Sequence, residues 1–463
     1  MISKDRIKNV IISKQEDVQR YTIIPRDIPG SDYGQLVMVG ARRSGKSYML
    51  YQKMQELLNQ GYRWNNMLFL DFEDERLDGF TLDDFDNMLI CHAELYNETH
   101  PLLFMDEIQN IDGWERFARR MADAKYRIWI TGSNQKMLSS EIQSRLGGRY
   151  ITKEVYPYSF SEFLNANDVK HSPADLYGTT NIANIQRYWN EYLFWGGMPQ
   201  IADKPFNSPE KRDYLIDTYR KIYLNDIANR TGIPSTKYSQ LRLLLKKMSE
   251  SVHQPQSYSN FKNLLSSISG AVSQPTVAKY IEGCEDAWLI LRLRNICSHL
   301  RERETSCKYY FIDNGVLNLH LDNGKGALLE NAVALSLFRK YGHDADNQRV
   351  FFYRDNVEVD FYIPEDNLAI QAAYSIFEDD NTRQREVNAL TKFEQYKPGN
   401  RRIIITNDET DIIKDEYGTI EVLPLWKWSL DVNLQARQVL STEENIKSPE
   451  QELNESRSGG YRR

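Results

Sequence analysis

Cysteine is scarce in this chain of 463 residues, and long hydrophobic runs are missing from it. Its four cysteines include no CxxC pair and are too few to cross-link a chain of this size, which disfavours a disulfide-rich secreted protein and a structural zinc site. A mean hydropathy of -0.60 and the shortness of the apolar runs exclude a transmembrane helix. The first 14 residues have no apolar core of signal-peptide length, so we expect a soluble, cytoplasmic protein without a membrane partner.

A large excess of charge is also missing, because 58 Lys and Arg residues face 65 Asp and Glu residues, a formal net charge of -7. The composition indicates no global attraction to nucleic acid, so any surface that binds DNA must be local. Several domains are expected, since the chain is about three times as long as a typical domain of ~150 residues. Hydrophobic residues make up 41% of the chain, which is enough to form their cores.

The order of apolar patterns divides the chain into five parts. Short apolar runs alternate with helical periodicity at first, which predicts an α/β fold with a parallel sheet, and helical periodicity alone follows. Next come a helix, helix, turn, helix, strand, strand order, a mixed α/β pattern and a polar tail. We expect a parallel-sheet domain over 1–155, a helical region over 156–235, a winged helix-turn-helix-like domain over 236–320, a small mixed α/β domain over 321–440 and a disordered tail over 441–463.

The residues that follow the first apolar run match the phosphate-loop motif GxxxxGK[ST], with a strand predicted before them and a helix after them. The glycines let the backbone wrap around phosphates, Lys46 reaches the β and γ oxygens, and Ser47 is a ligand of Mg²⁺. The residues predicted to bind ATP are Gly40, Ala41, Arg42, Arg43, Ser44, Gly45, Lys46 and Ser47.

The second part of the nucleotide site is predicted where the apolar run 102–105 ends in Asp106 and Glu107. Asp106 would complete the shell of Mg²⁺ and Glu107 would act as general base toward the attacking water, so ATP and Mg²⁺ are the expected cofactors. A further apolar run, 67–70, lies between the two motifs in the sequence. We expect that strand to separate the two motif strands in the sheet.

Polar and basic residues after the next apolar run, 128–130, are candidates for a role in hydrolysis. Ser133 or Asn134 would sense the terminal phosphate from the carboxyl edge of the sheet, unless they form a plain turn. Arg145 or Arg149 would stabilise transition-state charge in a neighbouring copy, unless they are ordinary surface arginines. The two arginines therefore predict an ATP-dependent homo-oligomer.

Seven segments carry a family resemblance across residues 36–200: GARRSGKS, LDFEDERL, LLFMDEIQN, ITGSN, LGGR, YPYSFSEFL and WGGMP. A weaker likeness continues through YRKIYLNDI and TVAKYIEGCEDAWLI to the terminal domain. The chain resembles the bacterial and archaeal AAA-type ATPases that join a P-loop domain to a C-terminal domain of uncharacterised function. The resemblance implies ATP binding, a winged helix and a C-terminal fold like that of restriction-type nucleases.

The predicted winged helix begins after Ser273, which can cap a helix that has proline in its first turn. Four arginines, Arg292, Arg294, Arg301 and Arg303, are expected on or near the wing. This array suits DNA phosphates, but winged helices also bind proteins, so DNA and a protein are both candidate partners. The residues predicted to face outward are Gln274, Thr276 and Lys279.

Two functions are consistent with these motifs. The first is an ATP-driven molecular switch, with hydrolysis through Glu107 and a signal passed to the winged-helix and C-terminal domains. The second is a regulator that binds DNA or another partner, in which the nucleotide is structural and turnover is negligible.

The terminal domain departs from an active nuclease, which needs an Asp and, on the next strand, a Glu-x-Lys. Glu330 and Asp360 are in place. Gln371, however, stands where the second acid is needed, and Ala373 stands where the lysine is needed. We therefore expect a fold retained for binding or packing.

We predict that the protein leaves supercoiled and linear DNA intact in Mg²⁺ or Mn²⁺, as measured by gel electrophoresis. The neutral Gln371 holds a divalent ion more weakly than a carboxylate does, and no lysine follows it on that strand. Lys392 or Lys397 is the alternative source of an ammonium group. Nicking that disappears in Asp360→Ala would contradict the prediction.

Overall fold

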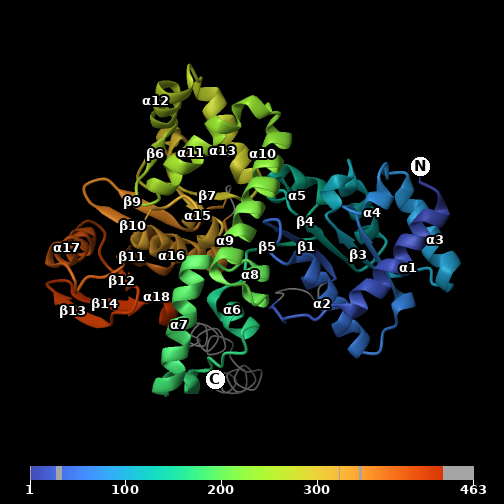
Figure 1. The fold of residues 1–463 in the computed structure, drawn as a ribbon, viewed down its shortest axis with the longest axis horizontal. Helices are drawn as coiled ribbons and strands as arrows, with labels where there is room; N and C mark the ends of the chain where they lie inside the picture. The colour runs from blue at the N-terminus through green and yellow to red at the C-terminus, as the bar shows by residue number, and fades with distance from the viewer. Residues whose placement is uncertain (1, 28–33, 323, 344–346, 431–463) are drawn as a thin grey trace, which may run out of the picture.

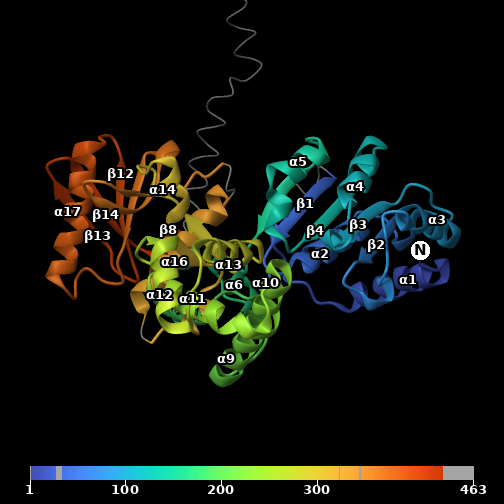
Figure 2. The same ribbon diagram turned by 90° about the horizontal axis from the view of Figure 1, so that it is seen from above.

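The computed structural model describes residues 2–27, 34–322, 324–343 and 347–430, so the predicted tail over 441–463 lies outside the described residues. The architecture is α/β, as the sequence predicts. Two large sheets stand at opposite ends of the molecule, and the mostly helical residues 156–286 lie between them (Figure 2). Within the described residues, no helix has the length and apolar character needed to cross a bilayer.

The N-terminal sheet, blue to teal in Figure 1, is parallel and has the spatial order β2-β3-β4-β1-β5. Its strands are β1 (Gln35–Gly40), β2 (Met67–Asp71), β3 (Leu102–Asp106), β4 (Ile128–Gly132) and β5 (Ile151–Val155). The helices of this domain are α1 (Lys4–Arg20), α2 (Lys46–Asn59), α3 (Asp84–Tyr96), α4 (Trp114–Asp123) and α5 (Ser140–Leu146). Alternate strand residues belong to two separate hydrophobic clusters, one with Val37 and Ile130, the other with Leu36 and Trp129. Both faces of the sheet are therefore buried, which explains the continuous apolar runs.

The predicted position of one strand in this sheet is wrong. The strand that separates β1 from β3 is β4, and β2 lies beyond β3 at the edge of the sheet. Sequence order does not fix spatial order here, because a crossover helix can carry the chain past a neighbouring strand. The carboxyl ends of β1, β4 and β3 still lie side by side, so the polar residues after them share one edge.

A helical region follows β5. Its helices are α6 (Phe160–Ala166), α7 (Thr179–Trp195), α8 (Pro199–Asp203), α9 (Ser208–Asp217) and α10 (Leu224–Thr231), with a π-helical turn at Thr218–Tyr223. Gly196 and Gly197 end α7, as the sequence predicts. Gly196 has a φ of 80°, and a Cβ there would lie 2.1 Å from Oδ1 of Asp313. A Cβ on Gly197 would lie 2.2 Å from the carbonyl oxygen of Tyr158, so neither position accepts a side chain.

The next part of the chain contains the three helices and two strands that the sequence predicts, together with one short strand and one short helix that it does not. It comprises α11 (Tyr238–Glu250), β6 (Gln256–Ser257), α12 (Tyr258–Ser269), α13 (Gln274–Asp286), β7 (Ile290–Leu293), α14 (Leu300–Thr305) and β8 (Ser306–Phe311). The strands form an antiparallel sheet in the order β6-β8-β7. Ser273 caps α13 by accepting a hydrogen bond from the backbone N–H of Thr276, and Val277, Tyr280 and Ile281 are buried.

The C-terminal part is built on a six-stranded mixed sheet with the order β13-β14-β12-β11-β10-β9. The strands β11, β12 and β14 run parallel, and the other pairs are antiparallel. Its strands are β9 (Phe351–Arg354), β10 (Glu358–Ile363), β11 (Leu368–Ala372), β12 (Arg401–Thr406), β13 (Asp411–Asp415) and β14 (Gly418–Pro424). Its helices are α15 (Asn314–Asn318), α16 (Lys325–Tyr341), α17 (Asp380–Tyr396) and α18 (Leu425–Leu430).

We predict that Asp313→Ala lowers the free energy of unfolding by about 2–4 kcal/mol, because it leaves buried backbone donors without an acceptor. Asp313 accepts hydrogen bonds from the backbone N–H groups of Gly197 at 2.7 Å, Gly315 at 2.9 Å and Val316 at 3.3 Å. Denaturant titration measures the change. The exposed Asp322→Ala is the matched control, and equal midpoints for the two variants would contradict the prediction.

Candidate nucleotide site

The phosphate loop joins β1 to α2 and has glycine where a side chain does not fit. A Cβ on Gly40 would lie 1.9 Å from the carbonyl oxygen of Val155 in the neighbouring strand. Gly45 has a φ of 93° and caps α2, whose first residues are Lys46 and Ser47. The loop therefore brings backbone N–H groups and a helix N-terminus to the carboxyl edge of the sheet, an arrangement that binds phosphate.

Asp106 ends β3 at the same edge and is buried. Its carboxylate accepts hydrogen bonds from the hydroxyl groups of Thr131 and Ser47. Burial raises the pKa of Asp106 to about 7, and the nearby carboxylates of Glu107 and Asp71 add to the rise. A cation would stabilise the ionised form in this setting, and the adjacent Ser47 hydroxyl supplies a second oxygen ligand.

Glu107 follows Asp106 with a left-handed backbone, φ 51°. Its Oε1 lies 3.3 Å from Nζ of Lys46, which also donates a hydrogen bond to the carbonyl oxygen of Ala41 at 2.9 Å. Nε2 of Gln109 donates to Glu107 at 2.6 Å, and Ser133 is a further partner. Burial alone would raise the pKa of Glu107, but Lys46 and these donors outweigh it and lower the pKa. The carboxylate is therefore held ionised, as a general base must be.

A cavity of about 780 Å³, whose chemistry fits ATP with Mg²⁺, is lined by Lys46, Ser47, Asp106 and Glu107 among others. Two buried polar atoms of residues next to these groups in the sequence, Ser44 Oγ and Gln109 Oε1, have no hydrogen-bond partner among the described residues. No cluster of three or more His, Cys, Asp or Glu side chains in the described ranges is arranged to hold a metal ion. Mg²⁺ does not need one, because it binds through one or two protein oxygens together with phosphate and water.

The predicted sensor residues have different surroundings. Ser133 is buried and its hydroxyl lies 3.3 Å from Nε2 of Gln109, so it belongs to the group that holds Glu107. Asn134 does not line the cavity, and its side chain caps the turn Gln135–Leu138 by accepting from the N–H of Lys136. The plain-turn alternative therefore describes Asn134 in this structure.

The two arginines predicted to act in a neighbouring copy also lie outside the cavity. Arg145 pairs with Glu115 and Glu141, each at 2.6 Å. Arg149 pairs with Asp123 at 2.6 Å. A role in an oligomer stays a prediction, because it requires a second copy of the chain.

A third arginine, Arg26, is a site residue that sequence reasoning missed. Its side chain is largely buried, and it donates to the carbonyl oxygen of Ser44 at 2.7 Å and to Glu162 at 2.6 and 3.0 Å. The side-chain amide of Gln52 exchanges two hydrogen bonds of 2.9 Å with the backbone of Arg26, which fixes its segment on α2. Its contacts lie up to 136 residues away, so no local signal reveals them.

Family comparisons agree with this geometry. Residues 33–164 match the model of an AAA domain, residues 186–326 match the domain of unknown function DUF8612, and residues 325–428 match the domain of unknown function DUF4143. An uncharacterized protein of Methanocaldococcus jannaschii is 32% identical over 438 residues, which cover 91% of this chain and 95% of that protein. The chain belongs to this family of AAA-domain proteins. An uncharacterized protein of Haemophilus influenzae is 31% identical over 407 residues, 85% of this chain and 94% of its own.

Solved structures resemble this family member less closely than the two relatives do. The crystal structure of Cdc6p from Pyrobaculum aerophilum is 12% identical, covers 69% of this chain and 98% of its own, and has a TM-score of 0.27. AMPPCP-bound DnaA from Aquifex aeolicus is 16% identical, covers 60% and 87%, and has a TM-score of 0.23. No functional conclusion follows from TM-scores this low.

The surface predicted to contact DNA carries less free positive charge than the sequence indicates. Gln274 and Lys279 on α13 are exposed, as predicted, whereas Thr276 is half-buried and its hydroxyl lies 2.8 Å from that of Ser273. The expectation for the wing is corrected by two ion pairs. Arg292 pairs with Glu285, and Arg294 pairs with Glu304 at 2.9 Å. Both arginines are mostly buried and their charge is used inside the protein.

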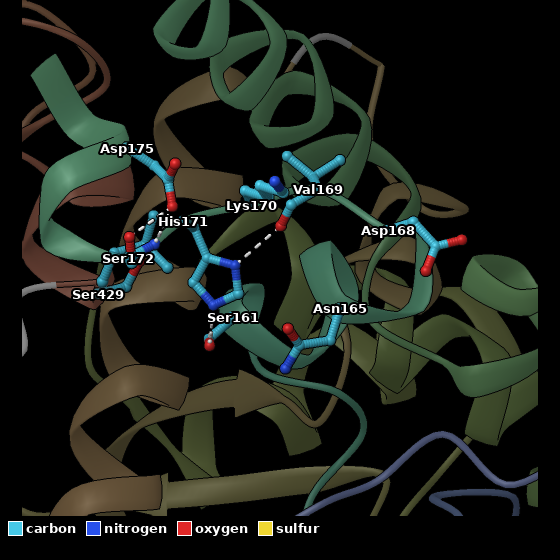
Figure 3. A pocket seen from close by; sticks show the side chains of 10 residues that line it. Ser161, Asn165, Asp168, Val169, Lys170, His171, Ser172, Asp175 and Ser429 are labelled. Carbon is cyan, nitrogen blue, oxygen red and sulfur yellow. Dashed lines mark hydrogen bonds between the residues drawn. The ribbon is translucent and has the colours of Figure 1, made fainter. Parts of the chain in front are cut away.

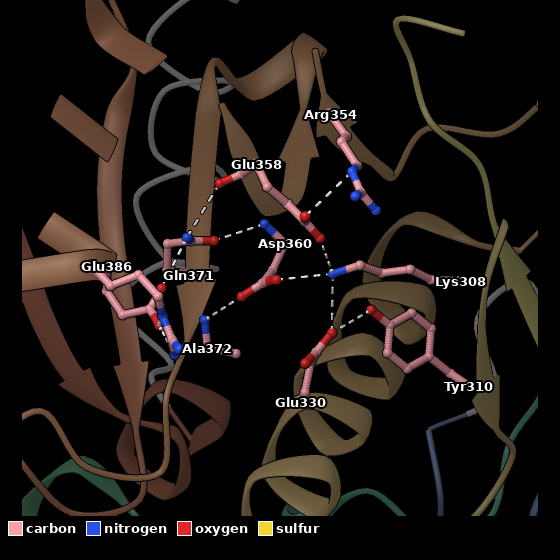
Figure 4. Close-up of polar contacts among 10 residues, drawn as sticks. Lys308, Tyr310, Glu330, Arg354, Glu358, Asp360, Gln371, Ala372 and Glu386 are labelled. Atoms are coloured by element: carbon pink, nitrogen blue, oxygen red, sulfur yellow. Dashed lines mark hydrogen bonds and ion pairs between the residues drawn. The ribbon is translucent and has the colours of Figure 1, made fainter. Parts of the chain in front are cut away.

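The C-terminal part contains a second polar centre, in which the ammonium group of Lys308 lies among three carboxylates (Figure 4). Lys308 comes from β8, outside the six-stranded sheet, and its side chain is fully buried. Its Nζ lies 2.9 Å from Asp360, 3.3 Å from Glu330 and 3.6 Å from Glu358. The hydroxyl of Tyr310 also donates to Glu330, at 2.9 Å. One cation from another sheet is thus shared by the three carboxylates.

Neither lysine named as an alternative supplies this charge. Lys392 is exposed, and Nζ of Lys397 lies over the rings of Tyr353 and Tyr362. Gln371 has a structural role, since its Oε1 accepts from the backbone N–H of Asp360 at 2.8 Å and its Nε2 donates to Glu386 at 2.9 Å. The absence of cleavage stays a prediction, with Lys308 as the residue that the sequence did not indicate.

A further cavity of about 600 Å³ lies beside α6 (Figure 3). Nδ1 of His171 lies 3.0 Å from the carbonyl oxygen of Val169, and Nε2 lies 2.7 Å from Oγ of Ser161. The carbonyl requires a proton on Nδ1, so Ser161 donates to Nε2 in the neutral ring. These bonds fasten the loop after α6 to the helix.

We predict that Lys308→Met lowers the free energy of unfolding by about 3–5 kcal/mol, because it leaves buried carboxylates without their cation. Adding Glu330→Gln should recover part of the loss, since burial raises the pKa of Glu330 to about 7 and its charged form is costly there. Calorimetry or denaturant titration measures both variants. The exposed Lys392→Met is the control, and a Lys308→Met protein as stable as this control would refute the assignment.

Proposed function

We propose that this AAA-domain protein hydrolyses ATP with Mg²⁺ and passes the state of its nucleotide to the domains that follow. The observation that supports the proposal is the convergence of Lys46, Ser47, Asp106 and Glu107 on one cavity at the carboxyl edge of the sheet. Loops and strand ends that lie far apart in the sequence meet there, each with the residue type that phosphoryl transfer requires.

The residues have separable tasks. The backbone N–H groups of the phosphate loop and the ammonium group of Lys46 bind the β- and γ-phosphates, and Ser47 with Asp106 holds Mg²⁺. The bound Mg²⁺ supplies neutralisation of charge on the phosphate oxygens. When Lys46 binds phosphate it leaves Glu107, and the freed carboxylate accepts a proton from the attacking water. Gln109 and Ser133 keep that carboxylate in place.

The helical region is the receiver of the nucleotide state in this proposal. Three residues of α8 and the position just after it line the same cavity as Lys46: Gln200, Asp203 and Lys204. Asp226 of α10 pairs with Arg42 of the phosphate loop at 2.8 Å. A ligand in the cavity therefore contacts both the AAA domain and the helices that lead to α13.

We predict that the protein releases phosphate from ATP, that Glu107→Gln lowers turnover by about 10²- to 10⁴-fold while ATP still binds, and that Lys46→Ala loses binding. Removing the base affects proton transfer, whereas removing the ammonium group affects affinity for the phosphates. Phosphate release and equilibrium binding are the two measurements. Turnover that survives both substitutions would refute hydrolysis at this site.

The second candidate is a regulator in which α13 and the strands β7 and β8 form a winged helix that binds DNA or a protein. Exposed Gln274 and Lys279 support contact with a partner, while the internal pairing of Arg292 and Arg294 favours a protein over DNA. The same assay separates the candidates. Tight ATP binding without turnover supports the regulator, and stimulation by duplex DNA would identify DNA as the partner.

A further inference from the structure

Arg42 of the phosphate loop lies between two carboxylates that belong to different parts of the protein. Its Nη1 lies 2.6 Å from Glu73, in the loop after β2, and its Nε donates to Oδ2 of Asp226, on α10, at 2.8 Å. The side chain of Arg42 lines the nucleotide cavity together with Lys46 and Glu107, and about 30% of it is exposed. Arg145 also pairs with two carboxylates, but it does not line the cavity, whereas Arg42 does.

The neighbouring arginine contacts the same part of the helical region. Arg43 has a left-handed backbone, with a φ of 64°. Its Nη1 lies 3.4 Å from the hydroxyl of Thr218, and its guanidinium lies over the ring of Tyr214 at 5.5 Å. Both arginines of the loop thus connect it with the segment from α9 to α10.

A guanidinium that pairs with carboxylates at the rim of a phosphate cavity can also pair with phosphate. Both anions offer two oxygens in the geometry of the guanidinium fork, and a terminal phosphate carries more charge than one carboxylate. Arg42 is within the cavity wall of its own chain, whereas Arg145 and Arg149 form their ion pairs outside it. An arginine supplied in cis is an established way to stabilise charge in nucleotide hydrolysis.

Helix α10 is packed closely enough on α13 to carry a movement to it. A Cβ on Gly283 of α13 would lie 2.3 Å from Cγ2 of Thr231 and 3.2 Å from Cγ2 of Ile227, so no side chain separates the two helices. Ile227 directly follows Asp226 in α10. A shift of Asp226 by the length of one hydrogen bond therefore displaces the surface on which α13 rests.

We propose that Arg42 contacts the terminal phosphate of ATP in cis by exchanging Asp226 for that phosphate, and that the release of Asp226 signals ATP occupancy to α13. The inference rests on the proposed function, because it needs nucleotide in the cavity. It assigns Asp226 as a competitor of the γ-phosphate and Arg42 as the residue that distinguishes ATP from ADP. Glu73 retains its place beside the guanidinium and limits how far Arg42 moves.

The test compares the affinities of a non-hydrolysable ATP analogue and of ADP, with Mg²⁺, for the full-length protein and its variants. Asp226→Asn removes the competing charge, so we expect it to bind the analogue about fivefold or more tightly, with the affinity for ADP changed less than twofold. Arg42→Ala should lower the affinity for the analogue about tenfold or more and should change the affinity for ADP little. Asp213→Asn, which removes an exposed acid on α9, is the charge-matched control and should bind as the unmodified protein does.

Hydrogen exchange supplies a readout that does not depend on turnover. The analogue should change the exchange of α10 and α13 in the unmodified protein, and Asp226→Asn should show the changed pattern without nucleotide. Arg42→Lys keeps the charge but not the forked geometry of the guanidinium, so it should bind the analogue more tightly than Arg42→Ala does and less tightly than the unmodified protein does. This variant also provides a test if Arg42→Ala folds poorly. If Asp226→Asn and the unmodified protein bound the analogue with equal affinity, the replacement of Asp226 by phosphate at Arg42 would be overturned, but the proposed function would not. No binding of analogue or ADP by the unmodified protein would overturn the proposed function and the exchange with it.

Discussion

A buried or half-buried carboxylate has to be paired with a cation or with hydrogen-bond donors, and the organisation of this protein depends on how that requirement is met. Glu107 is matched by Lys46, Glu162 by Arg26, and Asp360 by Lys308. In each pair the two partners come from different elements of the chain. The pairs therefore join elements as well as neutralise charge, and the functional site and the interfaces between domains are built from the same type of contact.

The two polar centres differ in whether a ligand can replace the partner of the buried charge. In the nucleotide cavity, Lys46 is shared between Glu107 and a carbonyl oxygen, so an incoming phosphate can take the place of Glu107 beside the ammonium group. In the C-terminal centre, Lys308 is fully buried among its acids, and removing it would leave them charged. The first centre is suited to a ligand that arrives and leaves. The second is suited to a permanent connection between β8 and the terminal sheet.

Sequence reasoning succeeds here where the signal is local. The phosphate loop and the acidic end of β3 are each contiguous with an apolar strand, so their residues and their shared edge follow from short patterns, and the five strands of the sheet are confirmed. It fails where partners are distant, as for Arg26, Arg42 and Lys308, because any of many acids could pair with each. The position of β2 was wrong for a related reason, since the crossover that places β4 between β1 and β3 leaves no mark in the sequence.

The nucleotide cavity also extends beyond the segment that matches the AAA domain. That match ends at residue 164, yet Gln200, Asp203 and Lys204 line the cavity and Asp226 holds the phosphate loop through Arg42. The loop that leads into α8 is fixed in turn by Asp313, which lies between β8 and α15 and accepts the N–H of Gly197. The geometry around the phosphates therefore depends on contacts that reach the C-terminal half. The wall of the cavity and the helices that follow it thus share side chains, and these shared contacts are what the proposed switch requires.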